Sequence, residues 1–220
     1  MSAAAPTDEL YERYLQKAIS EINELQHELL ALADETHVPV LGSGHPLGDV
    51  FLLKHAPLPA EIAEGVAFFG RSGNAILKSL QRLKVDPLAI YGTNCLKFGT
   101  EDAGQAAPWL TRELHIVQPK LLVVMGGEAA RFLDALDFPL ADGLEGAETG
   151  VVRRFTPTIE ALVTPDIDSA LERVDLVTHG RTAADDLHLQ AEYVAVRLEG
   201  VRDLHRELTR RGEDQPARLA

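Results

Sequence analysis

Residues 52–77 read LLKHAPLPAEIAEGVAFFGRSGNAIL and pass from an apolar run through a long loop into a helical pattern. Prolines stiffen the first part of the loop. Glycines in its last part allow the backbone to approach a ligand closely and open the N-terminus of the helix, where free N–H groups can meet a phosphate or a carbonyl. A phenylalanine in such a loop offers a face on which a planar ligand can stack. The same composition also fits an ordinary strand-to-helix loop with core phenylalanines, so both interpretations stay open here.

Short apolar runs alternate with helical patterns on both sides of this stretch. The apolar runs predict four strands, at residues 50–53, 88–91, 120–125 and 160–163. The helical patterns predict helices at residues 74–83 and 108–117. This alternation is typical of an α/β fold, which we expect to be a three-layer sandwich with a central, mostly parallel four-stranded sheet flanked by helices. In such sheets, ligands bind outside the carboxyl ends of the strands.

Long helices are expected at both ends of the chain. Residues 7–34 carry an apolar seam at heptad spacing, which fits a helix laid against its own domain or a short dimer surface. Residues 182–211 form a second helical stretch. Its neighbourhood contains three histidines without metal-ligand spacing, His179, His188 and His205. We expect a single domain over residues 1–220, made of an N-terminal helix (1–36), a core (37–175) and a C-terminal helical extension (176–220).

The composition limits the class of protein. With 220 residues, 45% of them hydrophobic, the chain is long enough for one well-buried core and short for two. It has no run of eighteen apolar residues and no secretory signal pattern, so we expect a cytoplasmic protein without a membrane span. The single cysteine, Cys95, excludes an internal disulfide and any multi-cysteine metal site. We therefore expect neither a metal nor a cofactor.

The charge is unevenly distributed. A net charge of −13 argues against a protein that holds nucleic acid by bulk electrostatics, because such binding depends on Lys and Arg. Residues 54–98, however, contain six basic and three acidic side chains, a local net charge of +3. One basic face on an acidic body is compatible with contact to DNA.

Four segments, in order and at matching spacings, resemble the uracil-DNA glycosylase superfamily and specifically its iron–sulfur "family four" branch. VLGSG followed by GDV is similar to the family's VxGEG…ADV, and the loop quoted above is similar to its GEAPG…GxPFVGRAG. YGTNCLK resembles its YxTNVVK, and QPKLLVVMGGEA resembles its PKxIVxLGxxA. These segments begin at residues 40, 52, 91 and 118, and the resemblance covers roughly residues 38–165. It implies the uracil-DNA glycosylase fold.

The resemblance also implies roles for individual residues. Asn94 would hydrogen-bond the Watson–Crick edge of a flipped uracil, and Phe68 would stack on its ring. A simple turn residue after a strand remains the alternative for Asn94. The segment around Ala56 would give backbone contacts, and the glycine turn would approach the DNA backbone. The complete set expected to bind substrate is Ala56, Pro57, Glu61, Phe68, Gly70, Arg71, Ser72, Gly73 and Asn94.

Three departures from the family pattern concern catalysis. His55 stands where the family has the acid that activates water; a histidine can act as a general base there, or it can be structural or contact the base. The family's late HPS motif corresponds to residues 163–170, VTPDIDSA, without a histidine to stabilise the leaving base. An aspartate cannot do so unless it is protonated. The four cluster cysteines are absent, with Phe98 and Ala107 near two of their positions.

These observations lead to an enzyme as the first hypothesis. It would flip uracil or a related deaminated base out of single- or double-stranded DNA and hydrolyse the N-glycosidic bond, with His55 as the catalytic residue. The alternative is a catalytically degenerate glycosylase fold that binds a base or nucleic acid without turnover. A third hypothesis is a partner-interaction protein that uses the N-terminal seam. We expect a monomer, with a dimer through the N-terminal helix as the other possibility.

Overall fold

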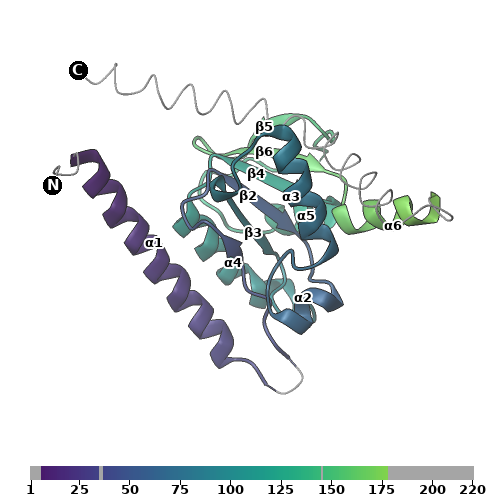
Figure 1. Ribbon diagram of the computed structural model, residues 1–220, viewed down its shortest axis with the longest axis horizontal. Coiled ribbons are helices and arrows are strands. Elements are labelled where there is room, and N and C mark those ends of the chain that lie inside the picture. The colour runs from purple at the N-terminus through teal and green to yellow at the C-terminus, as the bar shows by residue number, and fades with distance from the viewer. Residues whose placement is uncertain (1–5, 35–36, 145, 178–220) are drawn as a thin grey trace.

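The computed structural model describes residues 6–34, 37–144 and 146–177 (Figure 1). The elements follow one another in the order α1 (Pro6–Ala31), β1 (Ser43–Gly44), β2 (Val50–Lys54), α2 (Pro59–Glu64), α3 (Arg71–Leu83), the short 3-10 helix η1 (Pro87–Ala89), β3 (Ile90–Asn94), α4 (Ala103–Val117), β4 (Leu121–Met125), α5 (Gly127–Asp134), β5 (Val152–Arg154), β6 (Glu160–Thr164) and α6 (Ile167–Val177). The predicted C-terminal helix at residues 182–211 and the three histidines near it lie outside the described residues.

The sheet has six strands in the order β1-β3-β2-β4-β6-β5. Its four central strands, β3, β2, β4 and β6, are mutually parallel and correspond to the four predicted strands. The prediction of a four-stranded sheet is wrong because an antiparallel strand is added at each edge, β1 on β3 and β5 on β6. These edge strands are only two and three residues long and leave no apolar run in the sequence.

The third strand begins later than its sequence suggests. Residues 88–91 were expected to be extended, but Pro87–Ala89 forms a 3-10 turn and β3 starts at Ile90. Asp86 caps this turn, because its carboxylate accepts a hydrogen bond from the Leu88 N–H at 2.9 Å. The strand then extends to Asn94, which places that residue at the carboxyl end of the strand.

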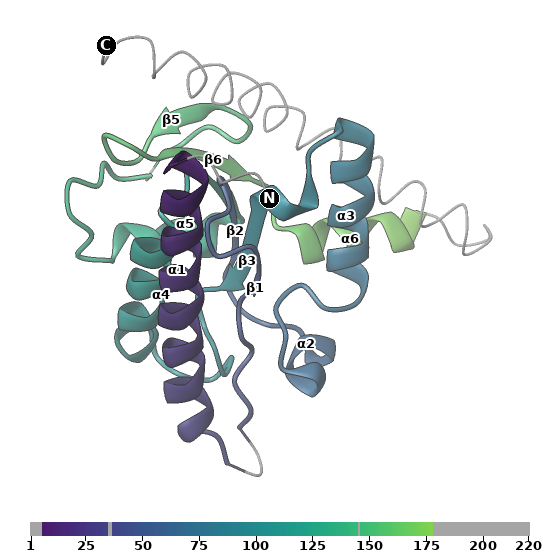
Figure 2. The same cartoon turned by 60° about the vertical axis from the view of Figure 1, so that its left-hand side comes forward.

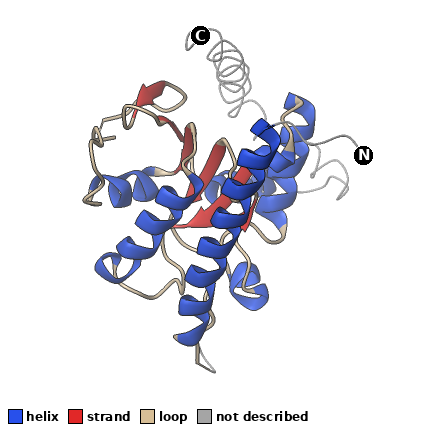
Figure 3. Cartoon of the chain, turned by 90° about the vertical axis from the view of Figure 1, so that its left-hand side faces the viewer, coloured by secondary structure: helices blue, strands red, loops and turns tan. Residues whose placement is uncertain are grey.

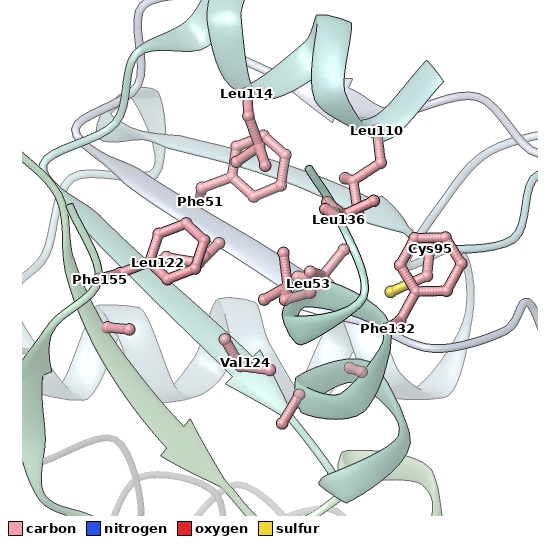
Figure 4. Close-up of a cluster of buried hydrophobic side chains, with 14 of the residues drawn as sticks. Phe51, Leu53, Cys95, Leu110, Leu114, Leu122, Val124, Phe132, Leu136 and Phe155 are labelled. Carbon is pink, nitrogen blue, oxygen red and sulfur yellow. The ribbon is translucent and has the colours of Figure 1, made fainter. Parts of the chain in front are cut away.

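Helices cover both faces of the sheet (Figure 2). On one face, Phe51 and Leu53 of β2 join a buried apolar cluster with α4 and α5 (Figure 4). On the other face, Val50 and Leu52 join a second cluster with α3 and α6. Because side chains alternate along a strand, a sheet covered on both faces needs apolar residues at consecutive positions, as in the continuous run of β4.

The long helix α1 lies along α4 (Figure 3). Its seam is buried in this contact through Ala18, Ile22, Leu25 and Leu29. An ion pair between Glu28 and Arg112 of α4 adds a polar contact at the surface. The described part of the chain contains no helix that is long and apolar enough to cross a membrane.

Candidate active site

The four parallel strands end side by side in a row of buried residues. Lys54 of β2 pairs in register with Asn94 of β3 and with Met125 of β4, and Met125 pairs with Thr164 of β6. Residues paired in this way point to the same face of a sheet, and Met125 belongs to the cluster under α3 and α6. The side chains of Lys54 and Asn94 therefore lie next to each other on the α3/α6 face. We call this place the strand-end site.

Phe68 is held over the same face by two glycines. A Cβ at Gly92, two residues before Asn94, would meet the Phe68 ring at 2.8 Å. A Cβ at Gly73 would lie 1.7 Å from the Phe68 carbonyl oxygen. Phe68 itself adopts a left-handed backbone conformation with φ of 59°, which is uncommon for a bulky residue. Such strain is typical of functional sites. The ring itself lies against β3 at Gly92.

Several buried polar atoms at this site have no hydrogen-bond partner among the described residues. They are both amide atoms of Asn94 (Nδ2 and Oδ1), Ser72 Oγ at the start of α3, and Asp168 Oδ1 on α6. Asn94 and Ser72 are completely buried. Because a buried polar group without a partner is costly, native proteins keep few of them. The Asn94 amide at the end of a central strand, beside the Lys54–Asp168 ion pair, indicates a site built for a polar ligand.

Lys54 carries a positive charge into this site. Its Nζ lies 2.5 Å from Glu61 Oε2 and 2.7 Å from Asp168 Oδ2. The same nitrogen lies 5.7 Å from the centroid of the Phe68 ring, over its face. Lys54 and Glu61 are both completely buried. Burial raises the pKa of Asp168 above its ordinary value, although the Lys54 ammonium acts in the opposite direction.

Glu61 has a structural use within the site. Its carboxylate accepts hydrogen bonds from the backbone N–H of Leu58, at 2.7 Å, and from that of Phe68. Together with the Lys54 ion pair, these contacts tie the end of β2, the start of α2 and the aromatic loop to one side chain. Glu61, which the sequence predicts to contact substrate, thus positions the groups that surround the site.

His55 follows Lys54 but lies on the opposite side of the strand end. Its Nδ1 is 3.2 Å from Glu128 Oε2 in the first turn of α5. Its ring packs edge-on against Phe132 of α5, with 6.4 Å between the centroids. The His55 side chain is 31% exposed, so water can reach it. His55 and Asn94 therefore occupy the two sides of the same sheet edge.

The other predicted binding residues lie just after β2 and at the start of α3. Ala56 packs against the cluster under α4 and α5, and Pro57 contacts the turn at Gly99. Gly70 precedes α3 with φ of 87°, a conformation that favours glycine. The exposed Arg71 donates a hydrogen bond from Nη2 to the Leu171 carbonyl at 3.1 Å and so links α3 to α6.

The residues present do not fit an iron–sulfur cluster. Such a cluster takes four thiolate ligands, and the chain has one cysteine. Cys95 is completely buried, and this burial raises the pKa of its thiol, which disfavours a thiolate. Phe98, near one family ligand position, packs against Trp109 with 5.9 Å between ring centroids. Over the described ranges, no group of three His, Cys, Asp or Glu side chains has the arrangement of a metal site.

Two comparisons with known proteins place the chain in a family. Residues 41–190 match the family described as the uracil DNA glycosylase superfamily. A Type-4 uracil-DNA glycosylase from Sulfurisphaera tokodaii is 23% identical over 103 residues, which cover 43% of this chain and 47% of that protein. The chain thus matches about half the length of this relative. The family match covers most of the chain and confirms the resemblance of the motifs: the chain belongs to the uracil DNA glycosylase superfamily.

Proposed function

We propose that the protein binds uracil, or a related deaminated base, flipped out of DNA and hydrolyses its N-glycosidic bond. The observation that carries this proposal is the buried Asn94 amide, whose donor and acceptor both lack partners among the described residues. A free amide at the end of a central strand, beside an aromatic ring, suits a flat ligand with an N–H next to a carbonyl. Uracil has both groups on its Watson–Crick edge.

The base would stack on Phe68 while Asn94 reads its edge. Ser72 Oγ offers a further hydrogen bond, because it is buried without a partner in the described part of the chain. Ala56 and Pro57 would border the base at the end of β2. Gly70 would let the DNA backbone approach the first turn of α3, where free N–H groups suit a phosphate. Gly73 instead makes room for the Phe68 carbonyl.

His55 would activate the attacking water. With Nδ1 facing the Glu128 carboxylate, the other ring nitrogen, Nε2, remains to accept a proton. The water oxygen would bond to C1′ of the sugar, its proton would pass to Nε2, and the base would leave with the electron pair of the broken C1′–N1 bond. Glu128 would act by holding the histidine in this tautomer.

Only part of the basic stretch can face DNA. Of its six basic side chains, Lys54 and Lys97 are completely buried in ion pairs. The exposed basic residues that remain on α3 and just after it are Arg71, Arg82 and Lys84. We therefore expect weak binding to undamaged DNA, with affinity that comes mainly from the flipped base.

The proposal is tested by base release from oligonucleotides that contain uracil, hypoxanthine or xanthine, in single- and double-stranded form. We expect the wild-type protein to leave alkali-labile abasic sites, and Asn94→Ala to slow release by about 100-fold or more, because two hydrogen bonds to the base are lost. Thr93→Val serves as the control, because Thr93 points to the other face of the sheet and contacts Glu113. Binding of damaged DNA without release would instead support the catalytically degenerate alternative.

The role of His55 needs a separate comparison. We expect His55→Gln to lower the rate of release by about 100-fold, as is typical of a lost general base. Glu128→Gln keeps a hydrogen-bond acceptor for Nδ1, so it should lower the rate of release by a smaller factor. If His55→Gln retains the wild-type rate and pH profile, the histidine has no part in water activation, whatever the role of Asn94.

A further inference from the structure

We propose that Lys54 supplies the positive charge that stabilises the departing base, an inference that rests on the function proposed above. When the C1′–N1 bond breaks, the electron pair stays on the base and its negative charge spreads to the carbonyl oxygens. A cation or a strong donor at that place lowers the barrier, because it binds the transition state better than the ground state.

The position of Lys54 fits this role. It is paired in register with Asn94, on the same face of the sheet, and its Nζ lies 5.7 Å from the centre of the Phe68 ring. A base that stacks on Phe68 and bonds Asn94 therefore lies beside the ammonium group. The other nearby cation, Arg71, is exposed and bonds the Leu171 carbonyl of α6.

The hydrogen bonds of Lys54 leave one of its N–H donors unused among the described residues. An ammonium group has three N–H donors. Two are taken by Glu61 and Asp168, at 2.5 and 2.7 Å, and Nζ has no third partner among the residues that the structure describes. Both of these partners are carboxylates, so Lys54 is held in two ion pairs. One charged N–H thus remains for an oxygen of the leaving base.

The residues after β6 explain how the cation is held. The segment at 163–170 has no histidine, but Asp168 from this segment binds Lys54 through Oδ2. The β6–α6 connection therefore contributes a carboxylate that orients a cation from β2. Around a buried side chain such as Lys54 a fixed charge acts more strongly than it would in water.

The test compares two leaving groups. Single-turnover release is measured for uracil and 5-fluorouracil in the same oligonucleotide, with wild-type protein and Lys54→Met. Fluorine stabilises the departing anion. The rate of base release by a protein without the cation should therefore depend more strongly on the fluorine substituent. We expect Lys54→Met to slow uracil release by about 100-fold or more. The factor by which it slows 5-fluorouracil release should be smaller by about tenfold or more.

Lys97→Met is the matched control, because Lys97 is also completely buried and paired with a carboxylate. It should slow both bases by the same factor. All proteins are compared at a temperature at which circular dichroism shows them folded. If Lys54→Met slows both bases equally, or neither, Lys54 is structural and this proposal fails while the glycosylase function stands. If the wild-type protein releases neither base, both proposals fall.

A second variant covers the case in which Lys54→Met does not fold. Asp168→Asn keeps the lysine and a side-chain oxygen that can accept its hydrogen bond, but it removes one opposing charge, so the ammonium should act on the base more strongly. We expect the ratio of the 5-fluorouracil rate to the uracil rate to fall below that of the wild-type protein. An unchanged ratio in the folded Asp168→Asn protein would overturn the role of Lys54.

Discussion

Two completely buried lysines lie on opposite faces of the sheet, and their surroundings differ. On the α4 face, Lys97 uses all three donors: it bonds Thr93 Oγ1 at 2.6 Å, the Asn94 carbonyl at 2.9 Å and Glu113. The other oxygen of Glu113 accepts the Tyr91 hydroxyl at 2.9 Å. On the α3/α6 face, Lys54 uses two donors among the described residues, and the neighbouring Asn94 amide has no partner among them.

This difference suits two roles: the Lys97 cluster supports the end of β3, and the strand-end site is the candidate place for a ligand. The Lys97 cluster is complete, so it has nothing left to offer a ligand and serves to stiffen the strand end. It also holds the backbone of Asn94 through the carbonyl, while the Asn94 side chain, on the opposite face, has no partner within the described part of the chain. The strand-end site instead keeps the Asn94 amide buried without a partner among the described residues. A protein tolerates that cost where a ligand completes the hydrogen bonds.

The largest expected effect comes from breaking the complete cluster. Lys97→Met should lower the free energy of unfolding by about 3–5 kcal/mol, because it leaves the buried Glu113 charge without its partner. Urea denaturation followed by circular dichroism measures this change. A loss below about 1 kcal/mol would mean that the cluster is not the rigid support described here.

Substitutions at two neighbouring positions on β3 should change the free energy of unfolding in opposite directions. Asn94→Leu removes two unpartnered atoms and should raise the free energy of unfolding by about 1–2 kcal/mol while abolishing base release. Thr93→Val removes a hydroxyl that bonds both Lys97 and Glu113 and should lower it by about 1 kcal/mol. Urea denaturation and base release measured on both variants test this prediction. It is wrong if Asn94→Leu is the less stable of the two proteins.

A smaller difference in stability is expected between substitutions of two serines in α3. Ser79 Oγ donates to the Ala75 carbonyl at 2.7 Å, whereas Ser72 Oγ is buried without a partner in the described structure. Ser79→Ala should cost about 0.5–1 kcal/mol of stability, and Ser72→Ala should be neutral or slightly stabilising. Thermal melts of the two variants separate these outcomes. Equal losses would show that Ser72 already has a structural bond.

The smallest effect concerns pH and Asp168. Because burial raises the pKa of this carboxyl in the folded protein, its protonated form is the one that folding favours. The contribution of Asp168 to stability is therefore present below the ordinary aspartate pKa and is lost as the pH rises through the raised value. Relative to Asp168→Asn, the wild-type protein should become less stable over that interval, as urea denaturation at a series of pH values would measure. The opposite slope would mean that the Lys54 ion pair dominates.

Much of the central sheet can be predicted from the sequence, because a strand buried on both faces leaves a continuous apolar run such as LLVVM at Leu121–Met125. The edge strands β1 and β5 could not be predicted, since two or three half-exposed residues carry no pattern of their own. The start of β3 was placed too early because the side chain of Asp86, rather than any hydropathy signal, makes the preceding residues turn.

The site was predicted in part. The motifs point to Phe68 and Asn94, which the structure brings to one face of the sheet. They miss Lys54, Gly92 and Glu128, whose importance depends on strand register and on contacts between distant segments. One signal was present: a lysine ends the otherwise apolar VFLLK of β2, and a charge at the end of a buried strand needs partners. The motif also does not reveal that the Glu61 carboxylate binds Lys54 and two backbone N–H groups, so its predicted contact with substrate stays a prediction.

The aromatic contact between Phe98 and Trp109 gives the molecule an intrinsic optical reporter. Trp109 is the chain's one tryptophan, and it packs on the loop that leaves Asn94. Emission excited in the indole band therefore comes from a single position close to the end of β3. Changes in its intensity or wavelength on titration with a damaged oligonucleotide would follow the arrival of the base in real time, without any attached dye.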